Sequence, residues 1–223
     1  MRSNLFATAL LIAAVPLSAQ TPAAHADHDP TNGVAAAPLP GGWSMRMDDK
    51  DAAKQARFVA EDGGYHVTSG GAAVYYRAKD MQRNGSFTES ATFIQTKPTR
   101  FHGEAYGLFL AGRDLPDTAK QTYLYFEVRQ NGDFLVNHRA GSAVHKVIDW
   151  TMNDAVHKPD ASGVATNDLS IKVGADSIRF MVNGTQVAAL SRKDFSDVSG
   201  DAGLRINHNL DVKVQKFSVE RGR

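Results

Sequence analysis

One stretch near the middle of the chain carries aromatic and charged side chains at every second position. Residues 123–139 alternate apolar and polar side chains on both sides of an Asn-Gly pair, which is typical of a tight hairpin. Successive side chains of a strand point to opposite faces, and those on one face recur about every 6.6 Å. One face of the first strand of this hairpin would therefore carry Tyr123, Tyr125, Glu127 and Arg129.

These four side chains have the chemistry of a sugar-binding platform. Aromatic rings stack on sugar rings, and carboxylate and guanidinium groups form hydrogen bonds with hydroxyl groups. The same pattern also fits a structural role, in which the two tyrosines belong to a core and Glu127 pairs with Arg129. The opposite face holds Leu124, Phe126 and Val128, which we expect to point between two packed layers.

Four more residues are candidate ligand contacts: Asn137, Arg139, Trp150 and Arg113. Asn137 and Arg139 lie on the return strand and would join the polar face if the register pairs them with it. Trp150 precedes a long loop and would project a ring into the mouth of a groove, whereas Arg113 follows a glycine-interrupted strand and would line the rim. Structural roles remain open for each of them, including core packing for Trp150 and a solvated loop charge for Arg113.

The sequence contains no recognisable catalytic motif. It has no cysteine and no Gly-x-Ser-x-Gly elbow, which argues against a thiol nucleophile and against a hydrolase-fold serine. If the protein is an enzyme, we expect a glycoside hydrolase in which Glu127 or Glu104 acts as general acid or base. Such a role requires that burial beside the aromatic side chains raises the pKa of the carboxyl group.

Charge and histidine spacing exclude other classes of partner and site. The 25 Lys and Arg residues nearly balance 24 Asp and Glu residues, which gives a net charge of +1, and no basic block suggests nucleic acid or an anionic membrane surface as a partner. The eight histidines lack the spacing of a zinc site, and the aspartates lack that of an EF-hand loop. We therefore expect no cofactor and no metal; the oligomeric state is left open.

The first part of the chain has the layout of an export signal. Residues 1–26 place a basic residue before an apolar run and small residues, with cleavage expected after Ala19 or Ala26. Residues 27–42 are rich in Ala, Pro and Gly, which is typical of a flexible linker, and 43–223 would form a single domain. We expect a periplasmic or extracellular protein without a membrane-inserted segment, stabilised by packing because it has no disulfides.

The rest of the sequence predicts about a dozen short strands separated by Asn-Gly and Gly-Gly turns, with a second hairpin at 183–184. Gly107, inside the predicted strand 104–111, indicates a close approach of backbones or a bulge. The phase of the apolar residues shifts between 214 and 217, as in a bulge. These features predict an all-β domain, a two-sheet antiparallel β-sandwich with about six strands in each sheet.

This strand rhythm resembles that of concanavalin A-like lectin and glucanase jelly rolls, and most of all bacterial secreted laminin-G-like and 3-keto-disaccharide hydrolase-like domains. The matching stretches are 106–110, 123–137, 169–173, 178–187, 203–206 and 217–219. The resemblance implies a jelly roll from about 43 to 220 whose concave sheet binds sugars, and it allows a calcium ion at a sheet edge.

One feature of the glucanase branch is missing. The Glu-x-Asp-x-x-Glu run, which places carboxylates on one face of a strand, does not occur among the five glutamates Glu61, Glu89, Glu104, Glu127 and Glu220. The usual retaining mechanism is therefore not expected. We expect a secreted or periplasmic carbohydrate-binding jelly-roll module; the alternatives are a glycoside hydrolase acting on a (3-keto-)glycoside and a non-catalytic envelope interaction protein.

Overall fold

The computed structural model describes residues 38–49, 56–96 and 103–222. The predicted signal peptide and most of the predicted linker lie outside these residues. The described part is built from fourteen β-strands and a short 3₁₀ helix, η2 (Ala78–Asp80). None of its helices is long and apolar enough to cross a membrane.

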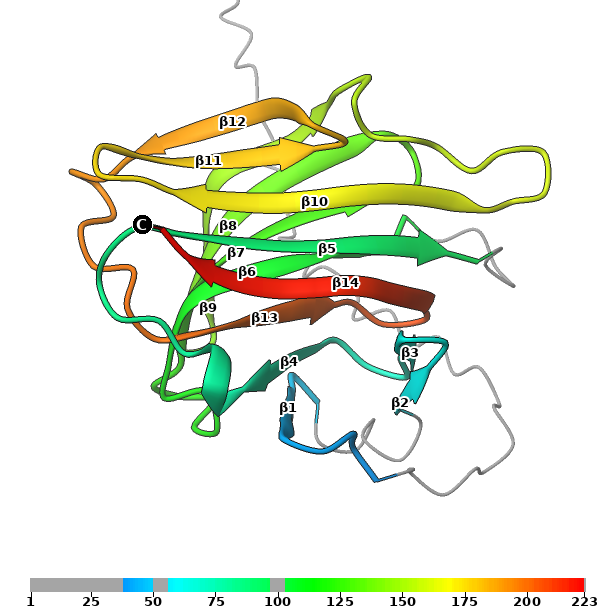
Figure 1. The fold of residues 1–223 in the computed structure, drawn as a ribbon, viewed down its shortest axis with the longest axis horizontal. Helices are drawn as coiled ribbons and strands as arrows, with labels where there is room; N and C mark the ends of the chain where they lie inside the picture. The colour runs from blue at the N-terminus through cyan, green and yellow to red at the C-terminus, as the bar shows by residue number, and fades with distance from the viewer. Residues whose placement is uncertain (1–37, 50–55, 97–102, 223) are drawn as a thin grey trace, which may run out of the picture. The chain divides into compact units, whose positions relative to one another are not determined.

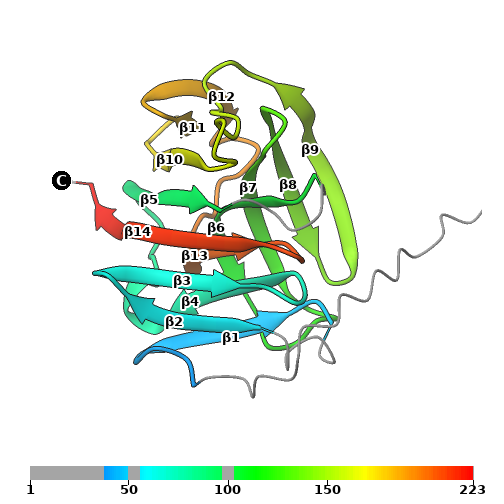
Figure 2. The same cartoon turned by 90° about the vertical axis from the view of Figure 1, so that its right-hand side faces the viewer.

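The strands form two antiparallel sheets of seven strands each, which make the two layers visible in Figure 1 and Figure 2. The first, sheet A, has the order β1 (Trp43–Met47), β4 (Ala73–Arg77), β13 (Asp201–Ile206), β6 (Ala105–Arg113), β7 (Thr122–Arg129), β8 (Asp133–Ala140), β9 (Ala143–Met152). The second, sheet B, has the order β12 (Thr185–Ser191), β11 (Ser177–Val182), β10 (Ala165–Val173), β5 (Phe87–Gln95), β14 (Asp211–Arg221), β3 (Gly64–Thr68), β2 (Arg57–Glu61). The predicted two-sheet sandwich is confirmed.

The alternation of β7 sets which face of sheet A is buried. Leu124, Phe126 and Val128 belong to the main core cluster between the sheets, as predicted. On β8, which pairs with β7, Phe134 and Val136 join the same core. The intervening residues of both strands therefore project from the outer face of sheet A.

Both predicted Asn-Gly hairpins are present, but their turns differ. Asn183 and Gly184 have φ angles of 48° and 81°, so β11 and β12 are joined by a two-residue turn with two left-handed residues. In the turn between β7 and β8 only Gly132 is left-handed, with φ of 96°, and its N–H donates to the carbonyl oxygen of Arg129 at 3.0 Å. This hairpin therefore has a longer loop than the sequence predicts.

The irregular strand positions also follow the sequence. A Cβ atom on Gly107 would collide with the carbonyl oxygen of Phe126 and would lie 2.8 Å from the Cα atom of Glu127, so β6 and β7 approach as closely as predicted. In β14 the pairing with β5 shifts between Gln215 and Ser218, which confirms the predicted bulge.

We predict that Gly107→Ala destabilises the domain by roughly 1–3 kcal/mol, because the added methyl group forces the backbones of β6 and β7 apart. Gly41→Ala is the matched control, since a Cβ atom there meets nothing within 4 Å. Chemical denaturation of both variants measures the free energy of unfolding. Equal stabilities would show that β6 and β7 do not approach so closely.

Candidate functional site

The two sheets present different outer faces. On β10 of sheet B the outward-facing side chains are short or charged: Thr166, Asp168, Ser170 and Lys172. On β7 of sheet A they are Tyr123, Tyr125, Glu127 and Arg129. The core of a sandwich requires apolar side chains only on the inner faces of its sheets, so this core does not account for the aromatic residues outside sheet A.

A second aromatic and apolar cluster covers this outer face. Leu115, from the loop between β6 and β7, packs over it. Tyr123 and Tyr125 are only 1% and 7% exposed, so these two rings do not form the open stacking platform that their spacing suggests. Partly buried Tyr76 and Trp150 pack against the cluster, whose buried members are Val74, Phe109, Leu115, Tyr123, Tyr125 and Leu135.

Sheet A is concave toward this cluster. Three strands separate β1 from β7 in the sheet, and at about 4.8 Å per strand a flat sheet would hold their backbones roughly 19 Å apart. Arg46 on β1 nevertheless donates a hydrogen bond from Nη2 to the hydroxyl oxygen of Tyr123 on β7, at 2.9 Å. The side chains of distant strands meet because the sheet curves around them.

Two guanidinium groups cover the tyrosine rings. The Cζ atom of Arg46 lies 5.5 Å from the ring centre of Tyr123, and that of Arg205, on β13, lies 5.7 Å from the ring centre of Tyr125. Both contacts are within the range of cation–π attraction. The rings on which a sugar would stack are therefore overlaid by the protein's own arginines.

Asp48, directly after β1, joins the two arginines. Its Oδ1 atom pairs with Nη1 of Arg46, and its Oδ2 atom accepts a hydrogen bond from Nη2 of Arg205 at 2.8 Å. Partial burial alone would raise the pKa of the Asp48 carboxyl group, but Arg205 and Arg46 outweigh burial and lower this pKa to about 2. Asp48 is therefore a carboxylate held between two cations.

Glu127 lies beneath this group with few partners. Gly107 on β6 is paired with Glu127 on one side and with Arg205 on the other, and Oε1 of Glu127 lies 3.8 Å from Nε of Arg205. Neither of these two atoms has a hydrogen-bond partner among the described residues. Burial raises the pKa of Glu127 to about 7 against the opposing effect of Arg205, and the nearby carboxylates of Asp48 and Glu104 add to the rise.

Arg129 pairs with the hairpin loop and not with Glu127. It forms an ion pair with Asp133 through Nη2, and its Nε atom donates to Oδ1 of Asn131 at 3.1 Å. Its Cζ atom also lies 4.1 Å from the ring centre of Trp150. Arg129 and Trp150 are both half-buried, so this stacked pair forms an accessible part of the concave face.

The remaining candidates on this face lie around these groups. Asn137 donates from Nδ2 to the hydroxyl oxygen of Tyr125 at 3.2 Å, and half-buried Arg139 donates from Nε to the carbonyl oxygen of Gly141 at 2.9 Å. Glu104 pairs with His208 at 2.8 Å.

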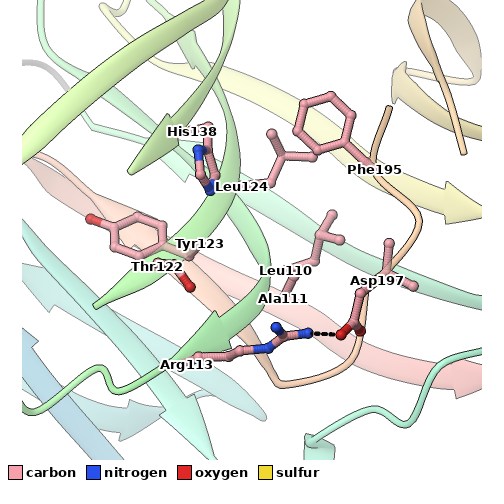
Figure 3. Close-up of a pocket in the computed structure, with 10 residues that line it drawn as sticks. Leu110, Ala111, Arg113, Thr122, Tyr123, Leu124, His138, Phe195 and Asp197 are labelled. Carbon is pink, nitrogen blue, oxygen red and sulfur yellow. Dashed lines mark ion pairs between the residues drawn. The ribbon is translucent and has the colours of Figure 1, made fainter. Parts of the chain in front are cut away.

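Arg113 lies at a separate cavity of about 100 Å³, shown in Figure 3. Its guanidinium group pairs with Asp197, and His138 and Phe195 lie across the cavity from this pair. The ring of Tyr123 points away from the other lining side chains. Of the predicted site residues, only Tyr123 and Arg113 are among those that line it: Leu110, Ala111, Arg113, Thr122, Tyr123, Leu124, His138, Phe195, Asp197 and Val198.

The sequence prediction missed Arg46, Asp48 and Arg205. The only local signal is an arginine within the apolar run 202–206, because a buried guanidinium group requires a counter-charge. The resemblance to jelly rolls also allows a calcium ion, but in the parts of the chain that the structure describes no three His, Asp or Glu side chains gather in a group that could hold a metal.

We predict that burial of Glu127 makes the domain less stable as the pH rises from about 4.5 to about 7. The unfolded chain loses this proton near 4.5 and the native state near 7, so the native state binds more protons within this window and rising pH favours unfolding. In Glu127→Gln the free energy of unfolding should not show this decrease, which is on the order of 1–3 kcal/mol in the wild type.

Urea denaturation of wild type and Glu127→Gln at several pH values measures the contribution of Glu127 to the pH dependence of stability. A second buried carboxyl group, Glu89, must be distinguished from it. Glu89 is also buried, and burial raises its pKa well above the ordinary value; Glu89→Gln is the control variant. Identical pH profiles for wild type and Glu127→Gln would contradict the assignment.

Comparison with known proteins establishes the fold. No protein-family model matches the sequence, and no curated protein matches it. The structure is similar to the carbohydrate-binding module CBM66 from Bacillus subtilis, with a TM-score of 0.58 and 13% identity over 80% of this chain and 95% of that chain. It is also similar to a putative glycosyl hydrolase from Parabacteroides distasonis, with a TM-score of 0.52 and 14% identity over 81% and 99% of the two chains.

A third similar structure is the potassium-bound carbohydrate recognition domain of Emp46p, with a TM-score of 0.57 and 10% identity over 82% of this chain and 89% of that domain. Structural similarity at such low sequence identity shows a shared architecture but does not show a shared activity. The domain is a β-sandwich of the concanavalin A-like jelly-roll type.

Proposed function

We propose that this domain is a carbohydrate-binding module whose ligand lies on the concave outer face of sheet A. The observation that carries this proposal is the aromatic cluster outside sheet A: the outward side chains of β10 in sheet B are short or charged, whereas the outer face of sheet A gathers aromatic rings, arginines and carboxylates that the core between the sheets does not need. Aromatic and hydrogen-bonding side chains together are what sugar rings require of a binding surface.

The half-buried side chains would make the contacts and the buried ones would hold them in place. Trp150, stacked on Arg129, offers the accessible aromatic ring at the β9 side, and Tyr76 offers a second ring at the β4 side. Beneath them the buried side chains of Arg46 and Arg205, which Asp48 joins, fix the floor of the concave face. Fixed side chains lose little entropy on binding a ligand.

The fold and the sequence support the proposal in different ways. A carbohydrate-binding module and a carbohydrate recognition domain share this architecture, although the fold alone does not define a ligand. The predicted signal peptide in 1–26 supports export, and we infer that the protein meets its ligand in the periplasm or outside the cell. We also propose, from the resemblance of strand rhythm, that among jelly rolls this domain is most similar to laminin-G-like and 3-keto-disaccharide hydrolase-like domains.

We predict that Trp150→Ala weakens binding of any sugar that a glycan array identifies by about tenfold or more, which corresponds to ~1.4 kcal/mol of lost stacking. Isothermal titration calorimetry measures the change. Ile94→Ala, which removes a half-buried apolar side chain from β5 of sheet B, should leave the affinity unchanged. Equal losses of affinity in the two variants, or no loss in either, would contradict a binding site on the outer face of sheet A.

One observation favours a second candidate function, hydrolysis of a glycoside. Burial raises the pKa of Glu127 to about 7, which suits a general acid near neutral pH, and Glu104 lies close enough to contribute to this rise. Against it stands the burial of Glu127, which is only 2% exposed and whose Oε1 atom is fully buried.

For a hydrolase, we predict that Glu127→Gln lowers kcat by at least 100-fold, the contribution typical of a general acid. Release of reducing sugar from a panel of glycosides and 3-keto-glycosides measures this activity, with Glu220→Gln at the exposed end of β14 as the control. A panel on which wild type shows no turnover, combined with sugar binding, excludes this function in favour of the binding module.

A further inference from the structure

The most unusual group on the concave face is a carboxylate held by two arginines. Asp48 pairs with Arg46 through one oxygen and with Arg205 through the other. The two arginine side chains are 5% and 7% exposed, whereas the Asp48 side chain is 25% exposed. The accessible group is thus an anion, and the cations that hold it are buried below.

This position is built to hold a carboxylate. Two guanidinium groups that each bind one oxygen match the planar, two-oxygen geometry of such a group. Both arginines are also fixed from below, because each stacks on a tyrosine ring and Arg46 donates to the hydroxyl of Tyr123. The cationic half of the site therefore remains in place whichever carboxylate lies between the two groups.

The surrounding charges favour an anion here. Glu127 is the other acidic group against Arg205, at 3.8 Å, and burial opposes its ionisation. Of the two ion pairs that Arg205 forms among the described residues, the one with Asp48, at 2.8 Å, is the closer. Asp48 directly follows β1, which among the described strands is an edge strand next to β4, so displacement of its side chain would not break a central strand.

We propose that the concave face selects uronic acids, a class of sugar that carries a carboxylate, and that the sugar carboxylate displaces Asp48 from between Arg46 and Arg205. This inference rests on the proposed carbohydrate-binding function and adds a ligand class to it. No covalent step is involved: one carboxylate replaces another on the same two guanidinium groups.

The test compares acidic sugars with their neutral esters. Calorimetry would use trimers of galacturonate, glucuronate and mannuronate, each beside its methyl ester, which keeps the sugar and removes the charge. We expect Asp48→Asn to bind at least one acidic trimer about tenfold more tightly than wild type does, because the competing anion is gone, and to bind the ester no more tightly. Asp168→Asn, which removes an exposed acid from β10 on the outer face of sheet B, should change neither affinity.

A second comparison does not depend on the folding of Asp48→Asn. Wild type should bind the acid more tightly than the ester, and Arg46→Gln should abolish that difference. Equal affinities for acid and ester in wild type, or an equal gain for both in Asp48→Asn, would overturn the inference. Binding of neutral sugars on the array without a preference for acids would support carbohydrate binding and contradict selection of uronic acids. If no sugar binds at all, both proposals are wrong.

Discussion

The alternation of side chains along β7 is the constraint on which the rest of the molecule depends. This strand lies inside sheet A, between β6 and β8, and it packs Leu124, Phe126 and Val128 against sheet B. A one-residue slip would exchange its two faces and place tyrosines and charges in the core. The same strand register that stabilises the sandwich therefore places Tyr123, Tyr125 and Glu127 on the concave outer face.

Burial of charge on that face needs compensation. Removing an isolated guanidinium group from water costs several kcal/mol, which a well-placed counter-ion and stacking contacts offset in part. Asp48 compensates Arg46 and Arg205 together, and the tyrosine rings support both arginines from below. Glu127 has the weaker position, with a single long contact to Arg205, and this explains why burial dominates its pKa.

The concave face is thus organised in two levels. A buried level of tyrosines, arginines and Glu127 is held by the curvature of sheet A, and an accessible level consists of Trp150 with Arg129, Tyr76, Arg139 and Asp48. Gly107 belongs to the buried level, where its position on β6 between Arg205 and Glu127 places no side chain between these two groups. A ligand on this face would meet the upper level and depend on the lower one for its geometry.

Periodicity and turn chemistry within a few residues specify the all-β class, the positions of the strands, both Asn-Gly hairpins and the two faces of β7. The glycine inside the predicted strand 104–111 indicates a close approach of backbones or a bulge, and Gly107 does lie at a close approach. Long-range packing alone makes Arg46 and Arg205 cover the tyrosines, makes Asp48 join them, and pairs Arg129 with Asp133 instead of Glu127. These contacts join β1, β13 and β7, which are distant along the chain, and no local pattern specifies which strands a curved sheet brings together.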